Sequence, residues 1–258
     1  MFGFKKWHRQ RLLKKPLPPA WLAVMERNVP YYRLLPGKQQ RELQGLTQVF
    51  LAEKRFEGCG GLELTDEIRV TVAAQGCILL LGRETDIYPK LRSVLVYPGA
   101  YVANVTAPQP DGTVVEGWQG RLGESWMQGY VVLSWNDVLR GAADIHDGRN
   151  VVYHEFAHQL DNESGAPEGA PLLLESSMYT DWARVFGAEY RALCDSVERG
   201  QPALLDAYGA VSPAEFFAVA TEFFFERPVE VRAQHPELYD QLKLYYQQDP
   251  ALRMAHAV

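Results

Sequence analysis

The segment VVYHEFAHQLDNESG, residues 151–165, constrains this chain most, because it places two histidines four residues apart with a glutamate directly after the first. In an α-helix, positions i and i+4 lie on one face about one turn apart. His154 and His158 would then present two imidazoles to the same point, where each can give a nitrogen to one Zn²⁺. The pattern H-E-x-x-H is therefore typical of a metal-binding catalytic helix.

Glu155 would lie on a neighbouring part of the same helix surface, too far round to serve easily as a ligand. It can still reach a water that the metal polarises and accept a proton from it as general base. The alternative is an amphipathic helix with a hydrogen-bonded pair of core histidines. Val151, Val152 and Phe156 supply apolar anchoring, and a buried imidazole pair without a metal needs other partners. Zinc is the favoured interpretation.

A catalytic zinc usually has three protein ligands and one open position. The extended pattern with a third histidine needs Gly at 161 and His at 164, where this chain has Asp161 and Ser164. We therefore expect a carboxylate as third ligand. The candidates lie on the loop after the helix and in the segment SPAEFFAVATEFFFERP, and they are Glu163, Glu168, Glu175, Glu215 and Glu222.

Residues 212–226 are predicted to form a strongly apolar helix, with Ser212 as N-cap and Pro213 at the first helical position. Glu215 and Glu222 are nearly two turns apart in it and share a face. One can bind zinc while the other supports a histidine through a hydrogen bond. The alternative is that both carboxylates are solvated, and the spacing alone does not decide.

The remaining patterns predict an α+β fold, with a few strands followed mostly by helices. We expect strands at 93–102 and 129–135, and helices at 176–199, 212–226 and 235–247. Residues 65–82 are predicted as a buried helix capped by Thr65, although their β-branched content leaves a strand open. Three parts are expected: a basic N-terminal tail (1–18), a helical N-terminal region packed on the core (19–80) and a catalytic domain (81–258).

Composition excludes several classes of protein. The formal net charge of −6 argues against direct nucleic-acid binding through overall positive charge. No stretch approaches the roughly 20 apolar residues of a membrane span. Three widely spaced cysteines predict reduced thiols in a cytoplasmic protein. The basic start, MFGFKKWHRQRLLKK, is predicted to be a mobile tail, or alternatively a weak contact for an acidic partner or a membrane surface.

Three segments, HEFAHQLD, DAYGAVSPAEFFAVATEFFFERP and LYYQQDP, resemble the Mlc titration factor A family of bacterial zinc peptidases. VLVYPGAYV and GESWMQGYVVLSW extend the resemblance, which covers the chain from about residue 17 to 253, the N-terminal third mainly in pattern. More distantly, the metal-site helices resemble the catalytic domain of anthrax lethal factor. The resemblance implies a zincin-like core with a small mixed sheet and one Zn²⁺ per chain.

The family's functional residues fall on this chain without departure. The resemblance implies His154, His158 and Glu215 as ligands, Glu155 as general base and Tyr208 as active-site tyrosine. A phenol O–H near the metal can donate to the oxyanion formed when water attacks a peptide carbonyl. Glu222 and Asp161 are then candidates for hydrogen bonds to the ligands, although Asp161 could equally be an acid on the helix surface.

The expected function is a zinc-dependent peptidase acting on peptide substrates, and the resemblance implies modest aminopeptidase activity. Nothing in the residues themselves separates removal of one N-terminal residue from internal cleavage. Members of the family are associated with binding the glucose-responsive repressor Mlc, so a regulatory role with an Mlc-type repressor is also expected. The alternative is a non-enzymatic protein that sequesters the repressor and has a structural zinc site.

Overall fold

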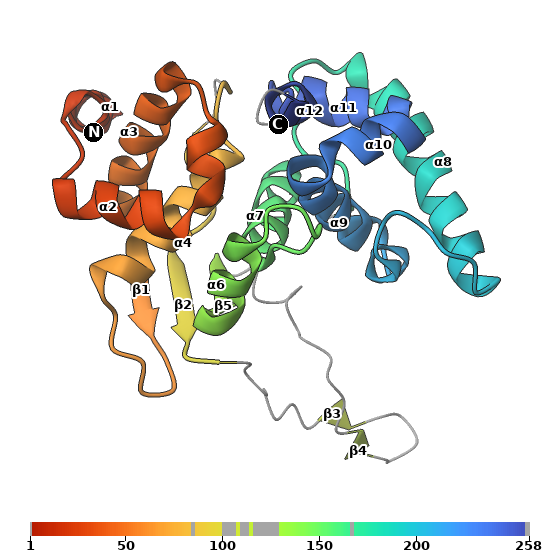
Figure 1. The fold of residues 1–258 in the computed structure, drawn as a ribbon, viewed down its shortest axis with the longest axis horizontal. Coiled ribbons are helices and arrows are strands. Elements are labelled where there is room, and N and C mark those ends of the chain that lie inside the picture. Colours follow the sequence, from red (N-terminus) through yellow and green to blue (C-terminus); the bar gives the residue numbers. More distant parts are fainter. Residues whose placement is uncertain are drawn as a thin grey trace.

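The computed structural model combines many helices with a small sheet that lies beside them, and the expected α+β class is confirmed (Figure 1). The structure describes residues 2–83, 86–99, 107–108, 114–115, 129–165 and 168–255. The first part of the chain contains α1 (Phe2–Lys14), α2 (Pro19–Asn28), the 3-10 helix η1 (Pro30–Leu34), α3 (Gly37–Glu53), β1 (Arg55–Gly58), α4 (Asp66–Ile78) and β2 (Ser93–Tyr97). Within the described residues, no helix has the length and apolar composition of a membrane span.

The rest of the chain carries two short strands, one longer strand and most of the helices. They are β3 (Ala107–Pro108), β4 (Val114–Val115), β5 (Tyr130–Ser134), α6 (Trp135–Ala143), α7 (Val151–Asp161), η2 (Asn162–Ser164), α8 (Met178–Glu198), η3 (Ala207–Ala210), α9 (Pro213–Glu226), α10 (Pro228–Gln234), α11 (Pro236–Tyr246) and α12 (Pro250–Ala255). The helices predicted at 176–199, 212–226 and 235–247 correspond to α8, α9 and α11.

A three-stranded parallel sheet in the order β1-β2-β5 lies beside these helices. Its register pairs Val94 with Phe56 on one side and with Val131 on the other. Parallel neighbours need a crossover connection, and α4 lies in the one between β1 and β2. The expected small mixed sheet thus divides into this parallel sheet and an antiparallel pair, β3-β4. The last residues of the strand predicted at 93–102 lie outside the described part of the chain.

The basic N-terminal segment differs from the expected tail, because residues 2–14 form α1, which packs against α3. Arg9 forms ion pairs with Glu53 on α3 and with Asp86. Gln48 on α3 also donates a hydrogen bond to the Lys15 carbonyl at 2.7 Å. The basic composition predicted a solvated segment, whereas the carboxylate that binds Arg9 lies 44 residues further along the chain, where no local pattern reveals it.

The segment predicted as a buried helix is helical, and it fixes the position of α7. Thr65 caps α4 by accepting a hydrogen bond from the Ile68 amide at 3.3 Å. Gly76 on α4 lies so close to α7 that a Cβ there would come within 2.7 Å of the Phe156 ring. The Tyr88 ring also packs edge-on against Phe156, at 4.8 Å between centroids. The H-E-x-x-H helix is therefore held by close packing on the N-terminal helices.

The Phe-rich helix α9 is buried at every position from Ala214 to Glu226. Trp182 of α8 and Tyr245 of α11 both pack edge-on against Phe217, while Tyr246 stacks on Phe224 at 5.6 Å. Aromatic side chains of α8 and α11 thus pack against α9, which also contacts α7. Polar side chains on the side of α9 that faces α7 therefore lie between two helices, α7 and α9, whose positions are fixed by packing in the core.

Candidate metal centre

Helix α7 begins at a well-formed cap and brings its two histidines to one side. The Asn150 side-chain oxygen accepts hydrogen bonds from the Val152 and Tyr153 amides, each at 3.1 Å, which satisfies two of the free amides at the start of the helix. His154 and His158 are both buried, and their ring centroids lie 4.9 Å apart. The i, i+4 spacing thus produces the geometry that the sequence predicts.

Helix α9 places two carboxylates opposite these rings. Ser212 caps it by accepting a hydrogen bond from the Glu215 amide at 3.2 Å, and Pro213 occupies the first helical position. Glu215 therefore lies in the first turn, and Glu222 follows almost two turns later on the same face. Both carboxylates are buried against α7 rather than solvated.

Three donor atoms converge between the two helices. Glu215 Oε2 lies 3.0 Å from His154 Nε2 and 3.3 Å from His158 Nε2, and the two nitrogens are 3.2 Å apart. Ligands at about 2.0–2.1 Å from a tetrahedral Zn²⁺ are separated from one another by about 3.3 Å. The three atoms therefore fit three corners of a tetrahedral site, and we call these residues the His-His-Glu cluster.

A hydrogen-bonded core pair is the alternative to a metal site. One proton on His154 Nε2 can be directed well toward Glu215 or toward His158, but not toward both. A cation in the middle contacts all three atoms at once. Within the described residues, this is the one group of at least three histidine, cysteine, aspartate or glutamate side chains whose donor atoms lie within 4.8 Å of one another. The arrangement therefore favours a metal ion.

The pKa values of the cluster side chains are shifted by burial and by their mutual contacts. Burial lowers the pKa of His158 to about 4. Burial acts in the same direction on His154, but hydrogen bonds with Glu215 and Glu222 raise its pKa to about 10. Burial alone would raise the pKa of Glu215, yet its hydrogen bonds with the two histidines lower it to about 2. An ionised carboxylate and one cationic group are thus stable together in this buried place.

Glu222 contacts the back of the cluster rather than its centre. Its Oε2 lies 3.0 Å from His154 Nδ1, and its Oε1 accepts a hydrogen bond from the Asn150 amide at 2.7 Å. Burial raises the pKa of Glu222, although the contact with His154 acts in the opposite direction. An Nδ1–H that donates to Glu222 leaves Nε2 free to act as a metal ligand, so this carboxylate can fix the tautomer of His154.

The structure brings together some of the residues considered from the sequence and leaves others apart. Asp161, at the end of α7, accepts a hydrogen bond from the Gly169 amide at 2.8 Å and so holds the loop that follows. Burial raises the pKa of Asp161 to about 6. The loop acids Glu163, Glu168 and Glu175 do not belong to the cluster, so Glu215 is the carboxylate that the fold brings to the histidines.

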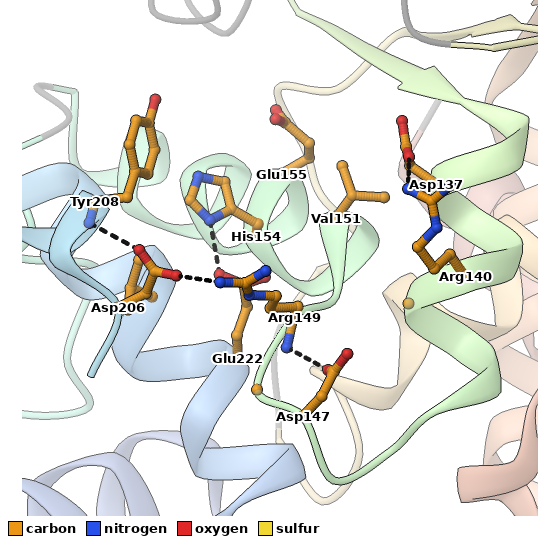
Figure 2. A pocket seen from close by; sticks show the side chains of 13 residues that line it. Asp137, Arg140, Asp147, Arg149, Val151, His154, Glu155, Asp206, Tyr208 and Glu222 are labelled. Carbon is orange, nitrogen blue, oxygen red and sulfur yellow. Dashed lines mark hydrogen bonds and ion pairs between the residues drawn. The ribbon is translucent and has the colours of Figure 1, made fainter. Parts of the chain in front are cut away.

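A cavity of about 570 Å³ lies beside His154 of the cluster and is also lined by Glu155, Tyr208 and Glu222, among others. Glu155 and Tyr208 lie on either side of the His154 ring, and their polar ends extend in the same direction (Figure 2). The rings of His154 and Tyr208 are 5.9 Å apart between centroids. Glu155 is buried, whereas Tyr208 is 46% exposed. A carboxylate and a phenol thus face one space beside the candidate metal ligands.

Several residues around this cavity were not anticipated from the sequence. Arg149 donates a hydrogen bond from Nη2 to Asp206 at 3.1 Å, and its amide donates to Glu226 at 3.0 Å. Asn150 donates from its side chain to Glu226 at 3.1 Å. Asp206 lies two residues before Tyr208, a common capping position, which could have drawn attention to it. Arg149 and Glu226 have partners 57 and 77 residues away, so no local signal existed for them.

Comparisons with known proteins agree over almost the whole chain. A family model described as glucose-regulated metallo-peptidase M90 matches residues 4–247. An uncharacterised protein of Synechocystis sp. is 41% identical over 249 residues, which cover 95% of this chain and 90% of that protein. Mlc titration factor A of Klebsiella pneumoniae is 33% identical over 230 residues, covering 88% and 85%. Mlc titration factor A of Cronobacter sakazakii is 32% identical over 244 residues, covering 93% and 89%.

Proposed function

We propose that this chain, which belongs to the glucose-regulated metallo-peptidase M90 family, is a zinc-dependent peptidase that cleaves peptide substrates. The observation that carries the proposal is the convergence of two imidazole nitrogens and one carboxylate oxygen at 3.0–3.3 Å, next to a cavity that His154 lines. Two histidines and one glutamate leave a fourth position for water or substrate, as catalytic zinc sites do.

In this proposal, His154, His158 and Glu215 hold the zinc. When bound there, zinc would act as a Lewis acid that polarises the substrate carbonyl and lowers the pKa of water. Glu222 keeps the His154 ring in the orientation and tautomer that ligation requires, through its 3.0 Å contact with Nδ1.

Glu155 is proposed as the general base. It follows His154 directly, is buried and lines the cavity, so its carboxylate can accept the proton of the attacking water. The same group can then give that proton to the amine that leaves when the peptide C–N bond breaks. A buried carboxylate at this position keeps the proton close to the reacting atoms in both steps.

Tyr208 is proposed as the donor that stabilises the oxyanion. Burial and the nearby carboxylates of Glu215 and Glu155 raise the pKa of its phenol. The phenol therefore stays protonated at neutral pH and can donate a hydrogen bond to the negative oxygen of the tetrahedral intermediate. Its position on the opposite side of His154 from Glu155 lets the two groups act on different atoms of one substrate (Figure 2).

The test combines metal analysis with turnover of amino-acid anilides. The wild-type protein is expected to contain about one zinc per chain. Glu155→Gln is expected to keep the zinc and to lower kcat by about 10²–10⁴-fold, because it removes the general base. Glu237→Gln, the same chemical change on an exposed carboxylate of α11, serves as the matched control. Unchanged turnover in Glu155→Gln would contradict the assignment.

Aminopeptidase action is the proposed form of this activity. It predicts that peptides with a free N-terminus are cleaved one residue at a time, whereas the same peptides with an acetylated N-terminus are not. Cleavage of a peptide library, read by mass spectrometry, distinguishes the two. Internal cleavage of acetylated peptides would instead assign an endopeptidase.

A second proposed role is regulatory, and it rests on the relatives that carry the name Mlc titration factor A. We propose that this chain also binds an Mlc-type repressor, which would place it in the cytoplasm. Binding that survives Glu155→Gln would separate this role from catalysis. A protein that binds the repressor and keeps its zinc, but cleaves no peptide, would be a sequestering protein with a structural metal site.

A further inference from the structure

We infer that Arg149 is a positioning residue for Tyr208, which it fixes through the carboxylate of Asp206. The inference rests on the catalytic role proposed above for Tyr208 and adds a residue that holds it in place. The contacts that carry it form a continuous chain from the start of α7 to the turn that bears the tyrosine (Figure 2).

The first link is a single carboxylate shared by two partners. Asp206 Oδ1 accepts a hydrogen bond from the Tyr208 amide at 2.9 Å and so caps the 3-10 helix η3. Its Oδ2 accepts a hydrogen bond from Arg149 Nη2 at 3.1 Å. Residues 206–210, which we call the Tyr208 turn, are thus tied at their first residue to a segment that lies 57 positions earlier.

The second link is a firm anchor for Arg149 itself. Its backbone amide is shared between Asp147 Oδ1, at 2.8 Å, and Glu226 Oε2 of α9, at 3.0 Å. The next residue, Asn150, caps α7 and donates its own amide to Glu222 at 2.7 Å. Arg149 therefore projects from the place where the histidine helix begins and where two buried carboxylates of α9 are bound. A guanidinium that starts from this point connects the Tyr208 turn to the metal-binding helices.

The two ends of the Tyr208 turn are held differently. Gly209 is buried, and a Cβ there would lie 3.1 Å from Leu193 of α8. The Ala210 carbonyl accepts a hydrogen bond from the Tyr190 hydroxyl at 3.3 Å. The far end is therefore fixed by packing, while Tyr208 is half-exposed near the Asp206 end. Loss of the Arg149 contact should loosen this end without unfolding the turn.

The exposure of the ion pair suggests a role in the rate rather than in folding. The Arg149 and Asp206 side chains are 75% and 35% exposed, and exposed ion pairs contribute little to stability. A hydrogen-bond donor in an active site, by contrast, must be placed to within a fraction of an ångström. Arg149 should therefore affect kcat much more than it affects the unfolding midpoint.

The test measures kcat, KM and zinc content for Arg149→Met and Arg149→Lys, each alone and combined with Tyr208→Phe. Arg149→Met is expected to lower kcat about 10-fold, a fraction of the loss for removing an oxyanion donor. KM and zinc content should stay within about twofold, because neither substrate nor metal contacts are removed. Arg149→Lys should recover part of kcat. With Tyr208→Phe already present, Arg149→Met should cause no further loss.

Two matched variants make the result specific. Arg184→Met removes another exposed arginine that binds a carboxylate of a distant segment, Glu237 at 2.7 Å, and it should leave kcat unchanged. Asp206→Asn keeps an oxygen for the Tyr208 amide but removes the charge that binds Arg149. It should therefore resemble Arg149→Met, and the double variant should be no worse than either one.

Hydrogen exchange gives a readout that does not depend on turnover. Arg149→Met should accelerate exchange of the amides in residues 206–208 and leave those of α7 and α9 unchanged. Unchanged exchange there would overturn the inference even if activity fell. Equal losses of kcat with and without Tyr208→Phe, or a rise in KM alone, would overturn it as well and show direct contact with substrate. If Tyr208→Phe alone were fully active, the catalytic role of Tyr208 would fail, while the exchange result would still decide whether Arg149 holds the turn.

Discussion

His154 of the His-His-Glu cluster and Tyr208 line the same cavity, yet the fold holds the cluster and the Tyr208 turn in different ways. The cluster residues come from α7 and α9, are at most 9% exposed and lie beside an aromatic core. Tyr208 is 46% exposed and comes from a four-residue 3-10 helix. Buried donors cannot move without breaking core packing, whereas an exposed turn can move at little cost. Core packing thus fixes the proposed metal ligands, whereas in our inference exposed polar contacts position the tyrosine.

The largest effect is expected for a substitution in the buried His-His-Glu cluster. Glu215→Ala removes one of three proposed ligands. Metal affinity should fall by more than the roughly 10–100-fold typical of residues that only hydrogen-bond a ligand, and peptidase activity should be lost with the metal. Competition with a chelator measures the affinity. A Glu215→Ala protein that still holds one zinc per chain as tightly as wild type would contradict the proposed ligand set.

The next largest effect is expected for a substitution in the exposed Tyr208 turn that leaves the buried cluster intact. Tyr208→Phe keeps the ring and removes the hydroxyl, so the proposed oxyanion loses one donor. We expect kcat to fall by about 10²-fold, with zinc content and chelator resistance unchanged. Circular dichroism and metal analysis on the same sample check that only the rate changes. Loss of zinc in this variant would show that the turn and the cluster are not separable.

A smaller effect is expected from the residue that supports a ligand from behind. Glu222→Gln keeps the size of the side chain but replaces the charged partner of His154 Nδ1. Metal affinity should fall about 10-fold, at the low end of the range for such partners, and saturating zinc should restore most of kcat. Activity that stays low at saturating zinc would show that Glu222 acts on the reaction itself.

The same comparison explains what the sequence could predict. The spacing of His154 and His158 is local, and one helical turn is enough to bring the two rings together. Glu215 and Glu222 share a face, so periodicity made both candidates but could not choose between them. The choice depends on how α9 crosses α7: Glu215 reaches both Nε2 atoms, and Glu222 reaches Nδ1 of His154. Tertiary packing, set by residues far away, decides this.

The contacts of the exposed Tyr208 turn were harder to predict, because they also join residues that are far apart in the sequence. Arg149 and Asp206 meet across 57 residues, and neither belongs to a periodic pattern. The N-terminal segment shows the same limit, because its basic composition is typical of a solvated tail, while Arg9 binds Glu53 of α3. Local patterns reveal helices, strands and motifs, whereas polar contacts between distant segments require the fold.

The last expected effect concerns folding stability rather than catalysis or metal affinity, and it compares the buried Glu226 with exposed carboxylates. Glu226 accepts hydrogen bonds from the Asn150 side chain and the Arg149 amide, but burial raises its pKa from 4.5 to about 9. Between these values the folded protein holds a proton that the unfolded chain has released, so this group makes stability fall as pH rises. Glu226→Gln should therefore gain stability relative to wild type between about pH 5.5 and pH 8.5, by up to about 4 kcal/mol, the ceiling for one proton over three pH units.

Urea unfolding with zinc present throughout measures the difference, with Glu237→Gln as an exposed control. A gain toward low pH instead would mean that the folded protein keeps Glu226 ionised.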